Sequence, residues 1–168
     1  DRAYITTKVG NPGGSGPGGK HPSGADYAGT GLGREHIEAQ INASLRRLAT
    51  DYVDYYLLHV ADSATPMEVT LSAVDRLIAA GKVRNWGFSN FDINQIEMML
   101  DLCRLGAAPM PVVAQPCYNW LERELEVGYL PICQSNDIAL TPYRPLAGGL
   151  LSGKYRSRGE PPAGSRAA

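Results

Sequence analysis

Apolar and polar positions follow two alternating patterns along the chain, and together they predict a repeated strand–helix unit. Short runs of β-branched and aromatic residues, typical of buried strands, alternate with longer segments in which apolar residues recur every three or four positions, as in amphipathic helices. The predicted strands are residues 3–9, 53–59, 83–88, 112–115 and 138–141. The predicted helices lie within residues 34–49, 65–81, 92–106 and 122–135, and a further short helix is expected to begin within 146–154.

Capping residues predict where two of these helices begin and end. Thr65 and Glu68 form the pattern of a capping box around a proline, and Gly81 is the stop signal that ends the same helix. Asp92 is placed to cap the next helix, which Gly106 ends in turn. The sequence therefore predicts discrete helices that short connections join to the strands.

Two segments have the composition of loops. Residues 10–33 are dominated by Gly, Pro, Ser and His and predict a flexible loop, and residues 156–168 predict a loop-like tail. Residues 14–20 approximate a phosphate-binding P-loop, but His21 stands where the magnesium-binding hydroxyl is needed and Pro22 where a helix should open. We therefore interpret residues 1–168 as a single domain without a P-loop.

The spacing of the strands narrows the fold class. Strand onsets near residues 53, 83, 112 and 138 recur at about the length of one βα unit, which favours a parallel α/β sheet. Five successive strands each end in a side chain suited to chemistry: Lys8, His59, Ser89 with Asn90, Gln115 and Tyr143. A (β/α)8 barrel gathers all strand ends around one mouth, whereas a doubly wound sheet joins only those at its switch point, so we prefer the barrel. A full TIM barrel needs about 250 residues, so the chain supplies about five of the eight βα units.

Composition and charge exclude several classes of partner. Sixteen basic and seventeen acidic residues give a net charge of -1 without charged blocks, which predicts no nucleic-acid or anionic-membrane surface. No apolar run is long enough to span a bilayer. Three cysteines without a CxxC pair indicate neither a disulfide framework nor a metal site, and favour a reducing, cytoplasmic setting. The expected partner is a small molecule or another protein.

Lys8 and His59 are the candidates for acid–base chemistry. Taken alone, each has an ordinary interpretation: a solvated lysine at a strand end, and a rim histidine satisfied by one hydrogen bond. On neighbouring strands of one barrel mouth, however, a desolvated ammonium lowers the pKa of a nearby acid, and an imidazole titrates near neutral pH. Together they would form half of an acid–base site.

The next three strand ends offer groups that suit a planar, phosphorylated ligand. Ser89, Asn90 and Gln115 are either ordinary cap and turn residues or hydrogen-bonding partners of a ligand carboxamide. Tyr143 is either a core aromatic or a ring that stacks on a heteroaromatic group. The glycines after it and Lys154 would suit a pyrophosphate, which needs close backbone approach and positive charge.

Four motifs in order resemble the aldo-keto reductase family, especially its branch with the potassium-channel β-subunits: DYVDYYLLH, GKVRNWGFSNF, VAQPCYNWLERELE and PYRPLAGGLLSGKY. The resemblance runs from Tyr4 to Lys154 and implies a (β/α)8 barrel that binds NADPH and reduces an aldehyde or ketone by hydride transfer from the nicotinamide. It implies that Lys8 tunes a tyrosine acid and that His59 orients the substrate carbonyl. The implied cofactor-binding residues are Ser89, Asn90, Gln115, Tyr143, Arg144, Pro145, Leu146, Ala147, Gly148 and Lys154.

The resemblance also implies residues that this chain does not contain. In the family, an aspartate and the proton-donating tyrosine lie on the first two βα units, and the segment that holds the adenosine 2′-phosphate lies near the eighth strand. Arg144 stands where a serine is more usual. We therefore expect the chain, which begins at Asp1 rather than at Met, to be part of a longer NADP-dependent reductase. The alternatives are a non-catalytic nucleotide-sensing or partner-binding subunit of the same fold, and an inactive truncated barrel that self-associates as a homo-oligomer.

Overall fold

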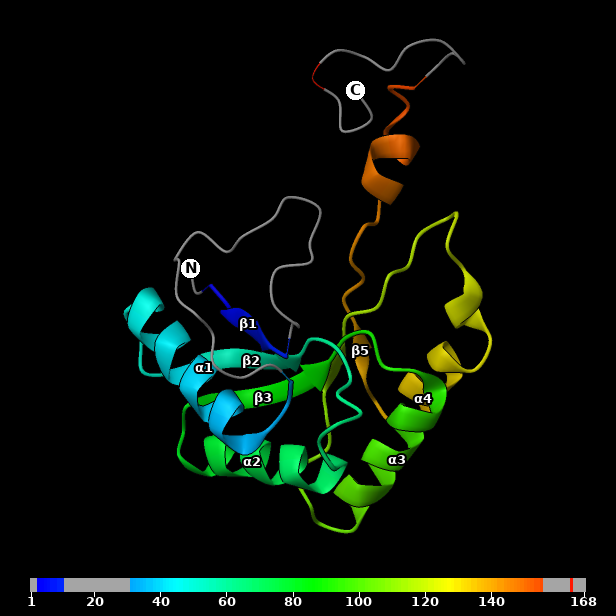
Figure 1. Ribbon diagram of the computed structural model, residues 1–168. Helices are drawn as coiled ribbons and strands as arrows, with labels where there is room; N and C mark the ends of the chain where they lie inside the picture. Colours follow the sequence, from blue (N-terminus) through cyan, green and yellow to red (C-terminus); the bar gives the residue numbers. More distant parts are fainter. Residues whose placement is uncertain (1–2, 11–30, 156–163, 165–168) are drawn as a thin grey trace.

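The computed structural model describes residues 3–10, 31–155 and 164, and it contains strands and helices that alternate in the predicted order (Figure 1). The strands are β1 (Thr6–Val9), β2 (Val53–Leu58), β3 (Val83–Phe88), β4 (Val113–Ala114) and β5 (Ala139–Leu140). The helices are α1 (Arg34–Leu48), α2 (Met67–Ala79), α3 (Ile93–Arg104) and α4 (Tyr129–Ser135), with 3-10 helices η1 (Glu124–Glu126) and η2 (Ala147–Ser152). The P-loop-like stretch, most of the predicted loop 10–33 and all of the tail 156–168 but residue 164 lie outside the described residues.

The five strands pair in parallel and in chain order, β1-β2-β3-β4-β5. Consecutive units of a (β/α)8 barrel have this order, whereas a doubly wound sheet reverses its order at a switch point. The register runs across the sheet in rows, and one row joins Lys8, Leu57, Gly87, Val113 and Ala139. The predicted partial barrel of five βα units is confirmed.

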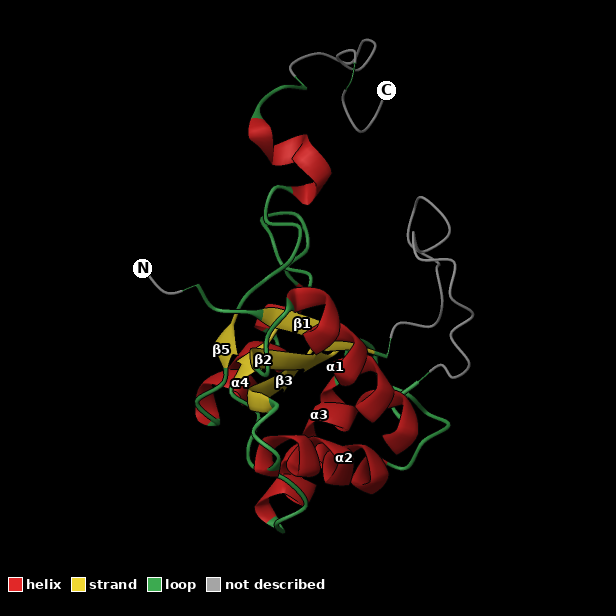
Figure 2. Cartoon of the chain, turned by 90° about the vertical axis from the view of Figure 1, so that its left-hand side faces the viewer, coloured by secondary structure: helices red, strands yellow, loops and turns green. Residues whose placement is uncertain are grey.

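Helices α1, α2 and α3 lie on one side of the sheet, as Figure 2 shows, and the apolar core lies between them and the strands. Alternate strand residues point into this core. Tyr56 on β2 donates its hydroxyl to a carbonyl of α1, and the Thr7 hydroxyl lies 3.5 Å from that of Ser44 on α1. Since side chains alternate between faces along a strand, Lys8 and Leu57 point to the opposite face, which is the inner face of the barrel.

The ends of the helices follow the predicted caps in one case and depart from them in another. Asp92 caps α3 through a reciprocal capping box with Gln95, each side chain accepting from the backbone amide of the other at 2.9 Å. The predicted capping box at Thr65 is wrong. The Thr65 hydroxyl donates to Asp62 at 2.6 Å instead, and Pro66 occupies the N-cap position of α2. No helix of the described residues has both the length and the apolar composition that crossing a bilayer requires.

The predicted helix 122–135 is wrong as a single element. The structure has η1 followed by α4, and between them Gly128 has φ 88°, a left-handed conformation that interrupts a helix. Before η1 the chain is held in a turn, because the Asn119 side-chain oxygen accepts from the amides of Leu121 at 2.9 Å and Glu122 at 3.2 Å. The helical spacing of apolar residues was real, but local bonds and one glycine divide the segment.

Three predicted strands are shorter than expected by at least two residues. β1 begins three residues late, and β4 and β5 keep two residues each. Pro111, Pro116 and Pro142 lie just outside β4 and β5, and proline cannot donate to the ladder of a sheet. The short helix predicted within 146–154 is a 3-10 helix that Gly148 and Gly149 interrupt with positive φ.

Gly87 is the position where β3 and β4 lie too close for a side chain. A Cβ added there would collide with the carbonyl oxygen of Val113 and would lie 2.6 Å from its Cγ1. We expect Gly87→Ala to lower the free energy of unfolding by about 2–3 kcal/mol, because the backbone of β4 must move.

Gly33→Ala is the matched control for this change. A Cβ added at Gly33 meets no atom of the described residues within 4 Å, and Gly33 has an ordinary φ of -65°, so the free energy of unfolding should change by less than about 1 kcal/mol. Urea denaturation of both variants beside the wild type measures the difference. A loss at Gly87 no larger than at Gly33 would contradict the close approach of β3 and β4.

Strands β1 and β5 are the edges of the sheet, and each pairs on one side only among the described residues. Unpaired edges beside an open inner face favour association with another copy. We therefore expect a polypeptide of residues 1–168 alone to self-associate, with an average mass in sedimentation equilibrium that rises with concentration. A mass that stays at 18.1 kDa across the range would contradict this expectation.

Candidate active site

The carboxyl ends of the five strands lie at one edge of the sheet, and the predicted residues that end the strands lie at this edge. Lys8 is the penultimate residue of β1, and His59, Ser89 and Gln115 directly follow β2, β3 and β4. The backbone amides of the last three each donate to the preceding strand at 2.7–2.8 Å, so the register is fixed at the mouth itself. Tyr143 lies three residues beyond β5. Parallel pairing therefore brings the predicted residues to one mouth.

Lys8 and His59 are electrostatically coupled across β1 and β2. The carbonyl of Val9 accepts from the His59 amide at 2.7 Å, which holds the two strand ends side by side. Partial burial lowers the pKa of His59, and the Lys8 ammonium lowers it further, while partial burial also lowers the pKa of Lys8. At neutral pH His59 is therefore held in its neutral form, which has one N–H donor and one acceptor nitrogen.

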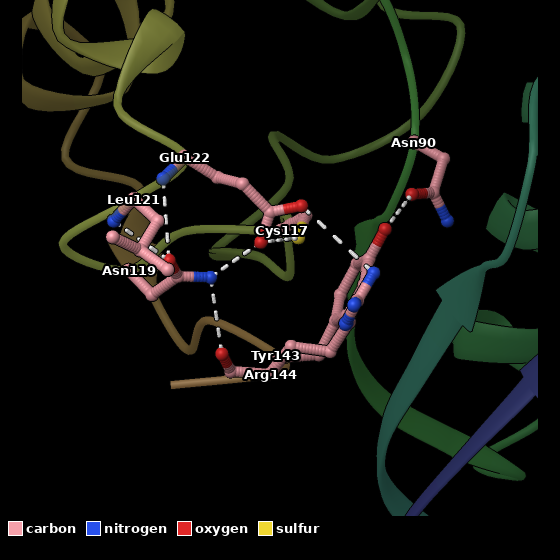
Figure 3. A network of polar contacts seen from close by, with 7 residues as sticks. All are labelled: Asn90, Cys117, Asn119, Leu121, Glu122, Tyr143 and Arg144. Carbon is pink, nitrogen blue, oxygen red and sulfur yellow. Dashed lines mark hydrogen bonds and ion pairs between the residues drawn. The ribbon is translucent and has the colours of Figure 1, made fainter. Parts of the chain in front are cut away.

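Asn90 joins the ends of three strands. Its side-chain amide donates to the His59 carbonyl at 2.8 Å and to the Ser89 hydroxyl at 3.0 Å. Its side-chain oxygen accepts from the Tyr143 hydroxyl at 2.7 Å (Figure 3). Asn90 has φ 55°, a left-handed conformation that asparagine tolerates better than most residues. Because both of its N–H donors are used, a ligand carboxamide can meet Asn90 only at the remaining lone pair of Oδ1.

Ser89 and Gln115 differ in how much of their hydrogen-bonding capacity the protein uses. Ser89 is buried, and its hydroxyl donates to the Gln115 carbonyl at 2.6 Å while it accepts from Asn90. The Gln115 side chain is half-buried and makes a 3.4 Å contact with the Thr141 hydroxyl, longer than a strong hydrogen bond. The hydrogen-bonding groups of Ser89 are therefore used within the protein, where they hold Gln115 and Asn90 in place. The side-chain amide of Gln115 is less constrained and is available to a ligand.

The segment after β5 carries the predicted pyrophosphate-binding residues and rises from the sheet to η2 (Figures 1 and 2). A Cβ added at Gly148 would lie 3.9 Å from Nη2 of Arg144, and one added at Gly149 would lie 3.1 Å from Nζ of Lys154. Two bare glycines are thus flanked by two basic side chains. We call these four residues the glycine cradle. Its close backbone approach and double positive charge fit a diphosphate group.

The three predicted residues between Arg144 and Gly148 have apolar side chains. Pro145 and Leu146 are exposed, whereas Ala147 is buried and has φ 47°. Any contact of these three residues with a phosphate would come from their backbone.

A polar cluster that the sequence analysis did not single out joins the connection after β4 to the connection after β5 (Figure 3). Buried Asn119 donates to the Glu122 carboxylate at 2.5 Å and to the Arg144 carbonyl at 3.1 Å. The Cys117 thiol donates to the same carboxylate at 3.3 Å, and Arg144 lies 3.8 Å from its other oxygen. The bond from Asn119, with smaller effects of Cys117 and Arg144, lowers the pKa of Glu122, so this carboxylate is ionised at neutral pH.

Glu122 was missed because residues 122–135 were interpreted as one helix, and Asn119 lies in the connection just before that segment. The usable signal was the length of the connection between β4 and α4, since long connections in compact domains are commonly functional. Within residues 3–10, 31–155 and 164, no three His, Cys, Asp or Glu side chains are grouped as they would be around a metal ion.

Replacing Lys8 tests the coupling between the ends of β1 and β2. We expect Lys8→Met to raise the pKa of His59 toward its ordinary value, because the ammonium charge is removed. The pKa should remain below that value, because burial of the imidazole persists. Lys82→Met, at the opposite end of the sheet, is the matched control and should leave it unchanged. Imidazole proton shifts followed through a pH titration measure the effect, and an equal pKa in wild type and Lys8→Met would refute the coupling.

Comparisons with known proteins identify the family of the chain. Residues 1–167 match the model of the aldo/keto reductase family. A probable voltage-gated potassium channel subunit beta from Arabidopsis thaliana is 39% identical over 137 residues, 81% of this chain and 42% of the relative. An L-glyceraldehyde 3-phosphate reductase from Escherichia coli is 34% identical over 156 residues, 92% of this chain and 42% of the relative. The chain thus spans less than half the length of these curated relatives.

A solved structure shows the same arrangement of strands and helices. The glycerol dehydrogenase from Gluconobacter oxydans superposes with a TM-score of 0.77 at 27% identity, over 96% of this chain and 46% of that one. The family model covers almost every residue, and the L-glyceraldehyde 3-phosphate reductase matches most of the chain at more than 30% identity. The resemblance found in the sequence is confirmed, and the chain belongs to the aldo/keto reductase family.

Proposed function

We propose that the chain supplies the cofactor-binding mouth and half of the acid–base site of an NADP-dependent reductase that converts an aldehyde or ketone to an alcohol. The observation that carries the proposal is the coupling of Lys8 and His59 at neighbouring strand ends, next to the Asn90–Tyr143 hydrogen bond. Membership of the aldo/keto reductase family and a relative named as a glyceraldehyde 3-phosphate reductase support the same reaction class and a small carbonyl substrate.

Lys8 and His59 have complementary roles in this proposal. Neutral His59 donates its N–H to the carbonyl oxygen and so orients the substrate, while the Lys8 ammonium stabilises the negative charge that develops on that oxygen. When bound, the nicotinamide cofactor supplies the hydride. Lys8 also lowers the pKa of an acid placed beside it, which suits the tyrosine that the family resemblance implies as proton donor. We assign that donor to no residue of this chain.

The remaining strand ends hold the cofactor in this proposal. The Tyr143 ring, held by its hydroxyl bond to Asn90, would stack on the nicotinamide. Asn90 and Gln115 would bind the carboxamide, and Ser89 would hold Gln115 in place through its bond to the Gln115 carbonyl. The glycine cradle would hold the pyrophosphate, and the backbone of residues 145–147 would be available to contact it. The preference for NADPH over NADH rests on the family resemblance.

A second function is favoured by the relatives named as potassium channel β subunits. A chain of this fold would then bind the nucleotide as a sensor and act on a partner protein without turnover. NADPH is the ligand in both functions, and both fit a cytoplasmic location.

Carbonyl-dependent NADPH oxidation by the intact gene product tests the proposal. His59→Gln and Lys8→Met should each lower kcat/KM by about 100-fold or more, the usual contribution of a positioned acid–base group, with little change in NADPH affinity. His36→Gln, a change on the outer helix α1, is the matched control and should retain the wild-type rate.

Three other results would redirect the interpretation. Wild-type rates in both His59→Gln and Lys8→Met would refute the assignment of these residues. NADPH binding without oxidation on a panel of aldehydes and ketones would favour the nucleotide-sensing subunit. Absence of both binding and turnover would favour the inactive barrel.

A further inference from the structure

The glycine cradle contains two basic side chains, those of Arg144 and Lys154, and Arg144 already has a counter-ion. Arg144 Nη1 lies 3.8 Å from Glu122 Oε1, while Nη2 of the same guanidinium lies beside Gly148. The guanidinium therefore lies between a carboxylate on the connection after β4 and the bare backbone of the cradle. An anion bound over Gly148 would contact the same guanidinium that Glu122 already pairs with.

The ion pair between Glu122 and Arg144 is easily broken. Its distance is too long for a hydrogen bond, and the side chains are 38% and 54% exposed, conditions in which an ion pair adds little to stability. The carboxylate, by contrast, is anchored separately by hydrogen bonds from Asn119 and Cys117. Arg144 can therefore leave this partner at small cost while Glu122 stays in place.

The backbone of Arg144 is anchored separately as well. Its φ of 59° is a left-handed conformation that arginine rarely adopts. The carbonyl of Arg144 accepts from the Ala147 amide at 2.8 Å and from the Asn119 side chain at 3.1 Å, and these two bonds hold the conformation. The base of the side chain is therefore fixed at the cradle whether or not the guanidinium faces Glu122.

We propose that Glu122 competes with a dinucleotide pyrophosphate for Arg144, so that ligand binding exchanges one counter-ion for the other. The inference rests on the proposed function, because it takes a dinucleotide as the ligand of the cradle. Phosphate oxygens accept two parallel hydrogen bonds from a guanidinium, an interaction stronger than an exposed ion pair at 3.8 Å. Glu122 thus keeps the affinity of the cradle below the value that Arg144 and Lys154 would otherwise give it, and Arg144 returns to Glu122 when the nucleotide leaves.

Titration of the intact gene product with NADPH, followed by nucleotide fluorescence, tests the exchange. Glu122→Gln removes the charge but keeps an oxygen that accepts from Asn119, and it should tighten NADPH binding by about 2- to 5-fold, the equivalent of one surface ion pair. Arg144→Gln should weaken binding by about 10-fold or more, because a charge-assisted hydrogen bond is lost. Glu124→Gln, an exposed acid two positions along, is the matched control and should leave the affinity unchanged.

The double variant gives the sharper measurement. In the Arg144→Gln background, Glu122→Gln should have little effect on NADPH affinity, because the competing carboxylate has lost the group for which it competes. In the Lys154→Met background, where Arg144 is intact, Glu122→Gln should still tighten binding. Thermal unfolding midpoints should be nearly equal in wild type and Glu122→Gln, since the ion pair is exposed.

Two results would overturn the exchange while the proposed function stands. One is unchanged or weaker NADPH binding by Glu122→Gln. The other is equal tightening with and without Arg144, which would indicate a general repulsion between Glu122 and the ligand. If the wild type binds no NADPH at all, the proposed function is refuted and the exchange with it.

Discussion

Parallel pairing of consecutive strands is the constraint on which every site in this chain depends. Because β1 to β5 run in one direction and pair in chain order, the residues that end them arrive at one edge of the sheet. The amides of His59, Ser89 and Gln115 form the last hydrogen bonds of the sheet at that edge, and Gly87 lets β3 and β4 approach two rows earlier. A register shift of one residue would turn each of these side chains toward the helices and dismantle the mouth without removing any of its residues.

The period of apolar positions predicted the elements that a packed core defines, such as β2, β3 and α1. It failed where a polar contact or a backbone restriction decided the outcome. The carboxylate of Asp62 draws the Thr65 hydroxyl away from the start of α2, Gly128 divides the segment 122–135, and prolines shorten β4 and β5. None of these effects changes the spacing of apolar residues, so none is visible in that spacing.

The candidate site, like the fold, was predictable only in part. Strand-end position was enough to bring Lys8 and His59 together, because parallel pairing is a property of the whole sheet. How Asn90 uses its hydrogen-bonding groups was not predictable, since each partner lies on a different strand end. The contact of Glu122 with Arg144 was not predictable either, because it spans two connections whose shapes depend on turns rather than on periodicity.

The connection between β4 and α4 packs against the apolar core at Leu125, and it also supplies a charge that faces the glycine cradle. Substitutions or small insertions in this connection would alter the electrostatic environment of the cradle without touching the strands that build the barrel. In the proposed exchange, ligand affinity can therefore change through this surface turn while the strands and the stability of the fold stay the same.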